Sequence, residues 1–222
     1  MNQLWQDFVT SAPIFLRALV VTLELSAASL AIGTVIGLVF ALLKLSKRRP
    51  LQWLANGYIT LIRGTPLIVQ IFWIYYGLVK IVSFDAFWAA SLALAAHAGA
   101  YIAEIFRAGI VSIDRGQMEA ARSLGMTYAQ AMRRIILPQA FRRIVPPLGN
   151  QFIIGIKDSS LAAFISMEEL FNWTMRRASS TFRDMNYYTI AAIYYLAVVI
   201  LFTMVVHWLE RRLNVDSTEV VS

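Results

Sequence analysis

Apolar residues in this chain gather into long runs, and short polar or charged segments separate the runs from one another. Most runs are about 20 residues long, which is the length that an α-helix needs to cross a hydrocarbon core of roughly 30 Å. The fourth run is shorter and more polar, with Lys157 and Asp158 in its middle. The pattern predicts an all-α integral membrane protein with five transmembrane helices, at about residues 14–43, 51–79, 86–106, 144–167 and 185–209.

The composition agrees with a membrane as the solvent. Of the 222 residues, 59% are hydrophobic and 15% are charged, whereas soluble domains have roughly half and a quarter. The chain has no cysteines, which excludes disulfides and cysteine-ligated metals, and no group of His, Asp and Glu has the spacing of a metal site. No segment resembles a linker or a separate soluble domain, so residues 1–222 are expected to form a single transmembrane domain.

Lys and Arg are distributed unevenly among the segments between the runs. Thirteen of the twenty follow the first run, lie between the third and fourth runs, or follow the fifth. Because cytoplasmic loops retain positive residues, we expect the N-terminus outside and the C-terminus inside. The net charge of +7 then reflects topology, and no nucleic-acid partner is needed to explain it. Only five of the twenty Lys and Arg residues lie on the expected outer side: Arg17, Lys80, Arg176, Arg177 and Arg183.

The longest hydrophilic segment, at about residues 112–143, has the signals of two short helices. The first is expected over residues 117–124 and ends at Gly125, a residue suited to a left-handed C-terminal turn. Thr127 and Gln130 form a capping box that opens the second helix, and Pro138 is expected to limit its continuation. By these properties alone, the segment is equally typical of a surface helix lying on lipid head groups.

The spacing within this segment is more specific than its helix signals. The motif begins with EAA, continues after three residues with Gly, and ends nine residues later with I-x-LP. This pattern resembles in full the EAA loop of ABC importer permeases. Segments 63–70, 100–109 and 146–161 resemble permeases for polar amino acids of the His/Glu/Gln/Arg type, so the resemblance covers nearly the whole chain. The residues that it assigns to ATPase coupling are Glu119, Ala120, Ala121, Gly125, Leu137 and Pro138.

The resemblance implies a type I ABC importer permease fold and a set of partners. The segment at 112–143 is then the coupling loop, which docks onto a dimer of cytoplasmic ATPase subunits that bind ATP and Mg. A second permease chain, identical or related, and a periplasmic or lipid-anchored amino-acid-binding protein complete the assembly in the bacterial inner membrane. The chain itself is expected to hold no cofactor and to catalyse no reaction.

Ionisable residues near the middle of the expected spans are candidates for a substrate site, because each is costly in a membrane unless it is paired or hydrated. At about 1.5 Å per residue, Glu24, Arg63, His97 and Asp158 each lie about 15 Å deep. The sequence at 64–66, Gly-Thr-Pro, predicts a broken helix with a freed carbonyl, as in helices that line a cavity. The predicted substrate-binding residues are Glu24, Arg63, Thr65, Pro66, Gln70, His97, Asp158 and Ser159.

A zwitterionic amino acid needs an acceptor for its ammonium group and a donor for its carboxylate. Asp158 is expected to accept from the ammonium group, and Thr65 is expected to donate to the carboxylate. Arg63 is a further donor to the carboxylate if it reaches the cavity. Glu24, as a second acid, favours basic or amide side chains over acidic ones. Glu24, Arg63 and Asp158 could instead form ion pairs between helices, but the broken helix at 64–66 favours a substrate role, and the sequence leaves the role of Lys157 open.

Two other functions fit parts of the sequence. A secondary transporter or channel also places charges at the midplane, although the chain has no detectable internal repeat and carries the coupling loop. An intramembrane enzyme needs a nucleophile beside a base, and no motif places a serine opposite His97. Glu104 and Arg107, three residues apart, are expected to form a local ion pair.

Overall fold

The computed structural model describes residues 3–77 and 84–213, and the regular elements in these ranges are helices. This confirms the all-α prediction. The end of the second predicted span, residues 78 and 79, and Lys80 lie outside the described residues. The elements are α1 (Gln3–Leu45), α2 (Arg49–Arg63), α3 (Leu67–Phe72), the π-helical η1 (Trp73–Gly77), α4 (Ala86–Val111), α5 (Arg115–Ser123), α6 (Tyr128–Ala131), the π-helical η2 (Met132–Ile136), α7 (Leu137–Asp158), the 3₁₀ helix η3 (Ser159–Ile165), α8 (Leu170–Thr181) and α9 (Asp184–Arg212).

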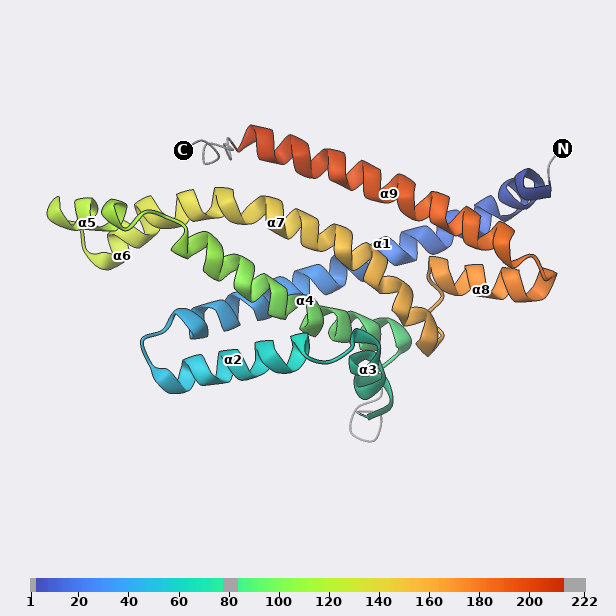
Figure 1. Cartoon of the computed structure of the whole chain (residues 1–222), viewed down its shortest axis with the longest axis horizontal. Coiled ribbons are helices and arrows are strands. Elements are labelled where there is room, and N and C mark those ends of the chain that lie inside the picture. The colour runs from blue at the N-terminus through green and yellow to red at the C-terminus, as the bar shows by residue number, and fades with distance from the viewer. Residues whose placement is uncertain (1–2, 78–83, 214–222) are drawn as a thin grey trace.

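The long helices follow one axis and form an elongated bundle (Figure 1). α1 begins at one end of this axis, and α9 finishes towards the other. The short helices α5 and α6 protrude from α4 and α7 at the end where α9 finishes, whereas α8 and the turn into α9 lie near the start of α1. The connecting segments therefore lie mainly at the two ends, and long helices run between them.

Small residues allow the helices to pack closely. A Cβ added to Gly37 of α1 would lie 2.6 Å from Ile102 of α4, so any larger residue would displace that neighbour. Gly109 of α4 is equally tight against Ile144 of α7, at 2.3 Å for an added Cβ. In a lipid solvent, close packing of this kind takes over much of the role that the hydrophobic effect has in water.

Within residues 3–77 and 84–213, three helices are long and apolar enough to cross a membrane, namely α1, α4 and α9. α2 and the segment 67–77 pass the same test only together, and they meet at an angle of 105°, so they form one broken span at most. α7 carries Arg142, Arg143 and Lys157 among its apolar residues and is not one of these candidates. The described residues thus give three or four candidate spans, and the count of five stays a prediction.

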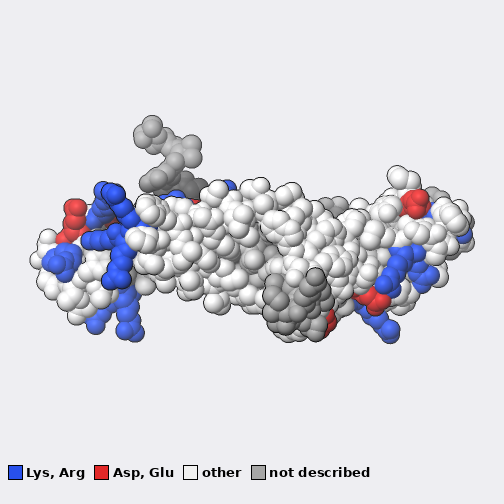
Figure 2. All heavy atoms as spheres, turned by 90° about the horizontal axis from the view of Figure 1, so that it is seen from below, with Lys and Arg blue, Asp and Glu red and all other residues white. Residues whose placement is uncertain are grey.

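Charged residues gather at the two ends of the molecule, and the surface between them is largely uncharged in the view of Figure 2. Lys and Arg are dense at the end that carries α5 and α6. Large exposed apolar side chains, such as Val35, Leu42 and Leu201, belong to the long helices. An uncharged band between charged ends is the surface that a bilayer requires.

The prediction that Pro138 limits the second loop helix is wrong. α6, the π-helical turn η2 and α7 follow one another without a gap from Tyr128 to Asp158. Pro138 is the second residue of α7, but α7 continues directly from η2, so the proline lies inside a helical path and removes one backbone hydrogen-bond donor there. The π turn changes the hydrogen-bond register immediately before the proline, which allows the helical path to continue.

Candidate functional site

The chain breaks between α2 and α3, at residues 64–66, where the sequence predicts an interrupted helix. Pro66 has no N–H, so the carbonyl of Ile62, four residues earlier, loses its usual helical donor. The side-chain amide of Gln70 takes that place, with Nε2 2.8 Å from the Ile62 oxygen and 2.9 Å from Thr65 Oγ1. The predicted free carbonyl is therefore present at the break, but Gln70 occupies it in this conformation.

His97 links this break to α4. Its Nδ1 lies 3.2 Å from Oε1 of Gln70; a carboxamide oxygen only accepts, so Nδ1 donates and Nε2 is left as an acceptor. One turn further along α4, the ring of Tyr101 lies 5.2 Å from that of His97, and the guanidinium of Arg63 lies 5.0 Å from the Tyr101 centroid. These contacts join Thr65, Gln70, His97, Tyr101 and Arg63 into one group, called here the polar cluster. Sequence reasoning missed Tyr101, although its spacing of four residues from His97 places both on one helix face.

His97 also lines a small cavity between α1, α4 and α7. Its polar lining consists of Ser26, Ser29, His97, Gln151 and Asp158. Its volume of about 10 Å³ leaves room for about one water molecule. His97 thus belongs to both the polar cluster and the cavity, and it brings Asp158 into the same site as the broken helix.

Two predicted site residues lie apart from this group. Glu24 is exposed on α1, whereas Ser26, two residues later and facing almost the opposite way, lines the cavity. Ser159 is fully buried, and its hydroxyl donates to the carbonyl of Ile156 at 2.8 Å. The substrate roles of both residues stay predictions, and no contact among the described residues supports them.

The ion pairs of the bundle do not involve the charged site residues predicted from the sequence. Within residues 3–77 and 84–213, Glu24, Arg63 and Asp158 form no ion pair with one another. Glu104 does pair with Arg107, at 2.9 Å between Oε2 and Nε, as predicted, and it also pairs with Lys44 of α1. α1 and α4 are therefore joined by charge near the end that carries α5 and α6.

A buried carboxylate that the sequence analysis missed holds α8 in place. Glu169 is fully buried and precedes α8. It accepts hydrogen bonds from the backbone N–H groups of Asn172 at 2.6 Å and Phe171 at 2.9 Å, and from the hydroxyl of Tyr195 on α9 at 3.0 Å. The side chain both caps α8 and attaches it to α9.

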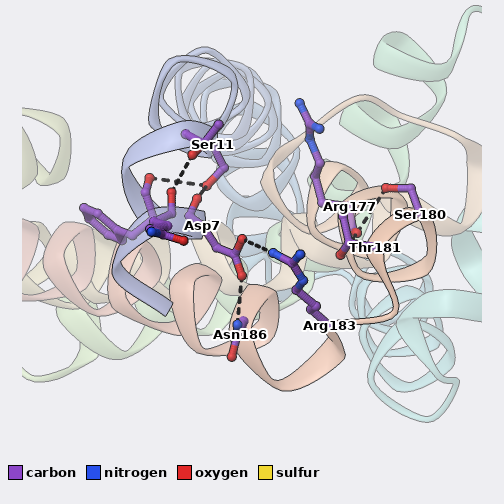
Figure 3. Close-up of polar contacts among 10 residues, drawn as sticks. Asp7, Ser11, Arg177, Ser180, Thr181, Arg183 and Asn186 are labelled. Atoms are coloured by element: carbon purple, nitrogen blue, oxygen red, sulfur yellow. Dashed lines mark hydrogen bonds and ion pairs between the residues drawn. The ribbon is translucent and has the colours of Figure 1, made fainter. Parts of the chain in front are cut away.

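A second missed network fastens the start of α1 to the start of α9 (Figure 3). The buried carboxylate of Asp7 accepts from Arg183 Nη1 at 2.7 Å and from Asn186 Nδ2 at 2.8 Å. Nothing in the local pattern pairs Asp7 with Arg183, because the two lie 176 positions apart. We call these three residues the Asp7 clamp.

The predicted coupling loop has the turns that its sequence indicates. Gly125 has a φ of 83°, in the left-handed region that residues with a Cβ rarely adopt. The N–H groups of Gly125 and Met126 donate back to carbonyls in the last turn of α5, both at 3.1 Å, which is a Schellman motif. Thr127 and Gln130 then form the capping box that opens α6, as predicted.

One side of the coupling loop packs on the bundle, and the other side is exposed. Ile113, Ile136, Ala140 and Ile144 form a buried apolar cluster that joins the loop to α4 and α7. Ala121 is buried as well, whereas Leu124 at the tip is 85% exposed. Ile135 of the motif is half-buried against this cluster, and the remaining motif residues are exposed: Glu119, Ala120, Gly125, Leu137 and Pro138.

Comparison with known proteins decides the family. The family model described as "Binding-protein-dependent transport system inner membrane component" matches residues 33–215. The chain belongs to this family. The permease is 36% identical over 216 residues to the arginine transport system permease protein ArtQ of Bacillus subtilis (strain 168), with 96% of this chain and 99% of the relative covered. It is 43% identical over 206 residues to the probable amino-acid ABC transporter permease protein PatM of Vibrio harveyi, over 91% and 92% of the two chains.

Solved structures agree with this assignment. The permease matches a chain of an amino acid ABC transporter crystallised with histidines, with a TM-score of 0.89 and 42% identity over 96% of this chain and 100% of that one. A chain of the inward-facing MetNI methionine ABC transporter matches with a TM-score of 0.80 at 20% identity, over 96% and 99% of the two chains, and shows a shared fold. The resemblance to amino-acid ABC transporter permeases is thereby confirmed, and the family consists of transport components rather than enzymes.

Proposed function

We propose that this permease is one half of the membrane pathway of an ATP-driven importer of polar amino acids in the bacterial inner membrane. The coupling loop carries the proposal, because it lies at one end of the molecule, is braced by a buried apolar cluster and exposes Glu119, Ala120 and Gly125. A cytoplasmic dimer of ATPase subunits that bind ATP and Mg takes hold of two such loops. The second loop belongs to a second permease chain, identical or related.

Import proceeds by alternating access in this proposal. The cavity beside Asp158 holds about 10 Å³, whereas small-molecule sites start at about 300 Å³, so a substrate enters only when the helices around the cavity separate. Closure of the ATPase dimer moves the coupling loops and supplies that rearrangement. The rigid turns on both sides of Gly125 suit a segment that transmits force.

The proposed topology has five crossings, with the N-terminus outside and the C-terminus inside. The fourth crossing is α7 with η3, and the second is the broken pair of α2 and α3. The start of α1 and the finish of α9 lie towards opposite ends of the bundle, which supports an odd number of crossings. The dense Lys and Arg around α5 and α6 support a cytoplasmic location for that end.

We infer that the substrate is a polar amino acid, preferably with a basic or amide side chain, delivered by a periplasmic or lipid-anchored binding protein. Asp158 accepts from the ammonium group, and Thr65 and Arg63 donate to the carboxylate. Nε2 of His97, which its hydrogen bond to Gln70 leaves as an acceptor, faces a donor on the side chain. The name of ArtQ, an arginine transport permease, supports a basic substrate.

Charge reversal in the coupling loop tests the proposal. In liposomes that hold the complete transporter, Glu119→Lys is expected to lower amino-acid uptake per ATP hydrolysed by about ten-fold or more, because a rim charge that becomes repulsive costs several kcal/mol. Gly125→Val is expected to act in the same direction through its left-handed backbone. Gln117→Lys, on the same exposed helix but outside the motif, is the control. Normal coupling in both motif variants contradicts the proposal.

A further inference from the structure

A larger cavity lies between α7, α8 and α9, outside the predicted substrate site. Its volume is about 300 Å³, which is within the range of small-molecule sites. Its walls are mostly apolar and aromatic, and one lining residue, Lys157, is charged. The lining residues are Lys157, Ser160, Phe171, Tyr188, Ala191, Ala192 and Tyr195.

Lys157 and its neighbour Asp158 line different cavities. Successive helical residues point about 100° apart, and here Asp158 lines the small cavity while Lys157 lines the larger one. In the part of the chain that the structure describes, Lys157 takes part in no ion pair. The neighbouring carboxylate of Asp158 lines the other cavity and forms no ion pair with Lys157 among the described residues. An ammonium group beside apolar walls in a membrane is stabilised by a directly bound anion, so a negatively charged occupant suits this cavity.

The depth of the cavity indicates what kind of anion this is. Tyr188 and Tyr195 lie four and eleven residues after Asp184, where α9 begins, so the cavity extends from about 6 to about 16 Å along the helix. The polar head-group region takes up roughly 6 Å on each side of the hydrocarbon core. With the fifth crossing expected from residue 185, the cavity lies just below the head groups, from about 4 to about 15 Å into the hydrocarbon. The flexible stem of Lys157 extends its ammonium group from near the middle of the membrane towards the head groups.

We propose that this cavity binds an acidic membrane lipid, with the head group on Lys157 and the upper acyl chain along Phe171, Ala191 and Ala192. A phosphodiester supplies the missing counter-charge, and the chain fills the apolar part of the cavity. A free amino acid carries a carboxylate but has no chain to cover these walls. The proposal depends on the permease function only through the membrane location of the chain.

Lipid binding to the purified transporter tests this proposal. The delipidated complex in detergent is titrated with phosphatidylglycerol or with phosphatidylcholine, and bound lipid is counted by native mass spectrometry. Phosphatidylglycerol is expected to bind with higher affinity than phosphatidylcholine. Lys157→Gln is expected to weaken it about ten-fold, the size of one hydrogen bond to a charged group. Lys157→Arg retains the charge and the binding, while Ala192→Phe fills the cavity and removes it. Arg17→Gln, another exposed cation in the bundle, is the control and leaves binding unchanged.

Three results overturn the proposal. The first is phosphatidylglycerol binding that both Lys157→Gln and Ala192→Phe leave intact. The second is displacement of the lipid by free arginine or glutamine, which identifies the cavity as an amino-acid site. The third is loss of the paired permease chains in Lys157→Gln with lipid binding unchanged, which identifies a second permease as the occupant. ATP-driven uptake is measured on the same samples, and its absence with normal lipid binding counts against the proposed function alone.

Discussion

The side chain of Gln70 supplies the hydrogen-bond donor that Pro66 lacks, and its oxygen orients His97. The sequence predicts the break itself, because Gly-Thr-Pro interrupts a helix by local chemistry. It also predicts a substrate contact for Gln70, and that contact stays a prediction. It does not predict that Gln70 closes the break, because its amide reaches a carbonyl eight residues earlier and local spacing does not encode that contact.

Replacing Gln70 by leucine tests this role. Gln70→Leu has similar size but leaves the Ile62 carbonyl and the His97 Nδ1–H without their partner. An unsatisfied buried polar group costs about 1–3 kcal/mol, so the purified permease is expected to unfold at a lower temperature. Gln70→Glu keeps an acceptor for His97, but its ionised carboxylate is buried and faces the Ile62 carbonyl, so it is expected to unfold at a temperature at least as low as that of Gln70→Leu. Equal unfolding temperatures in all three proteins contradict this account of the break.

Glu24 tests the substrate preference. The residue is exposed on α1 in a single chain, so it acts on a substrate only if a second permease or a helix movement brings it to the pathway. In reconstituted liposomes, Glu24→Gln is expected to lower arginine uptake by several-fold more than glutamine uptake, because only arginine has a cationic side chain for the acid to attract. If both uptakes stay at the level of the unaltered transporter, Glu24 belongs to the packing surface and the basic preference loses its support.

At the scale of helices, local sequence signals determine some features, and contacts between distant segments determine others. The Schellman turn at Gly125 and the capping box at Thr127 follow from residues within a few positions of each other, and the sequence predicts both. The Asp7 clamp and the network around Glu169 join helices that are far apart in the chain. Such pairs depend on how the bundle assembles, and one sequence without that arrangement does not reveal them.

The Asp7 clamp is expected to stabilise the junction of α1 and α9. Arg183→Gln removes the charged partner of a buried carboxylate, and we expect a loss of about 1–3 kcal/mol in the free energy of unfolding. Asp7→Asn together with Arg183→Gln is expected to cost less than the sum of the single variants, because neither charge is then left alone. Denaturant titration of the four proteins measures the coupling. Strict additivity means that the ion pair does not hold the helices together.

At the scale of the whole molecule, the apolar runs predict long helices, an uncharged band and five crossings, and the number of crossings stays a prediction. α1, α4 and α9 are apolar enough to be recognised by composition alone. α7 is more polar because Gln151 and Asp158 line an internal cavity, where the bundle shields them from lipid. α1 and α4 also line this cavity through Ser26 and His97 but pass the same test, because the rest of each helix is apolar enough.

The most direct test of the account asks what energy source drives transport. The complete transporter is reconstituted in liposomes, and accumulation of labelled arginine and glutamine is followed with ATP on the side of the coupling loops, and separately with an imposed ion or proton gradient without ATP. The account predicts that uptake requires ATP hydrolysis and that a gradient alone drives no uptake. It also predicts that Glu119→Lys uncouples ATP hydrolysis from uptake. Accumulation driven by a gradient in the absence of ATP contradicts it and identifies the chain as a secondary transporter.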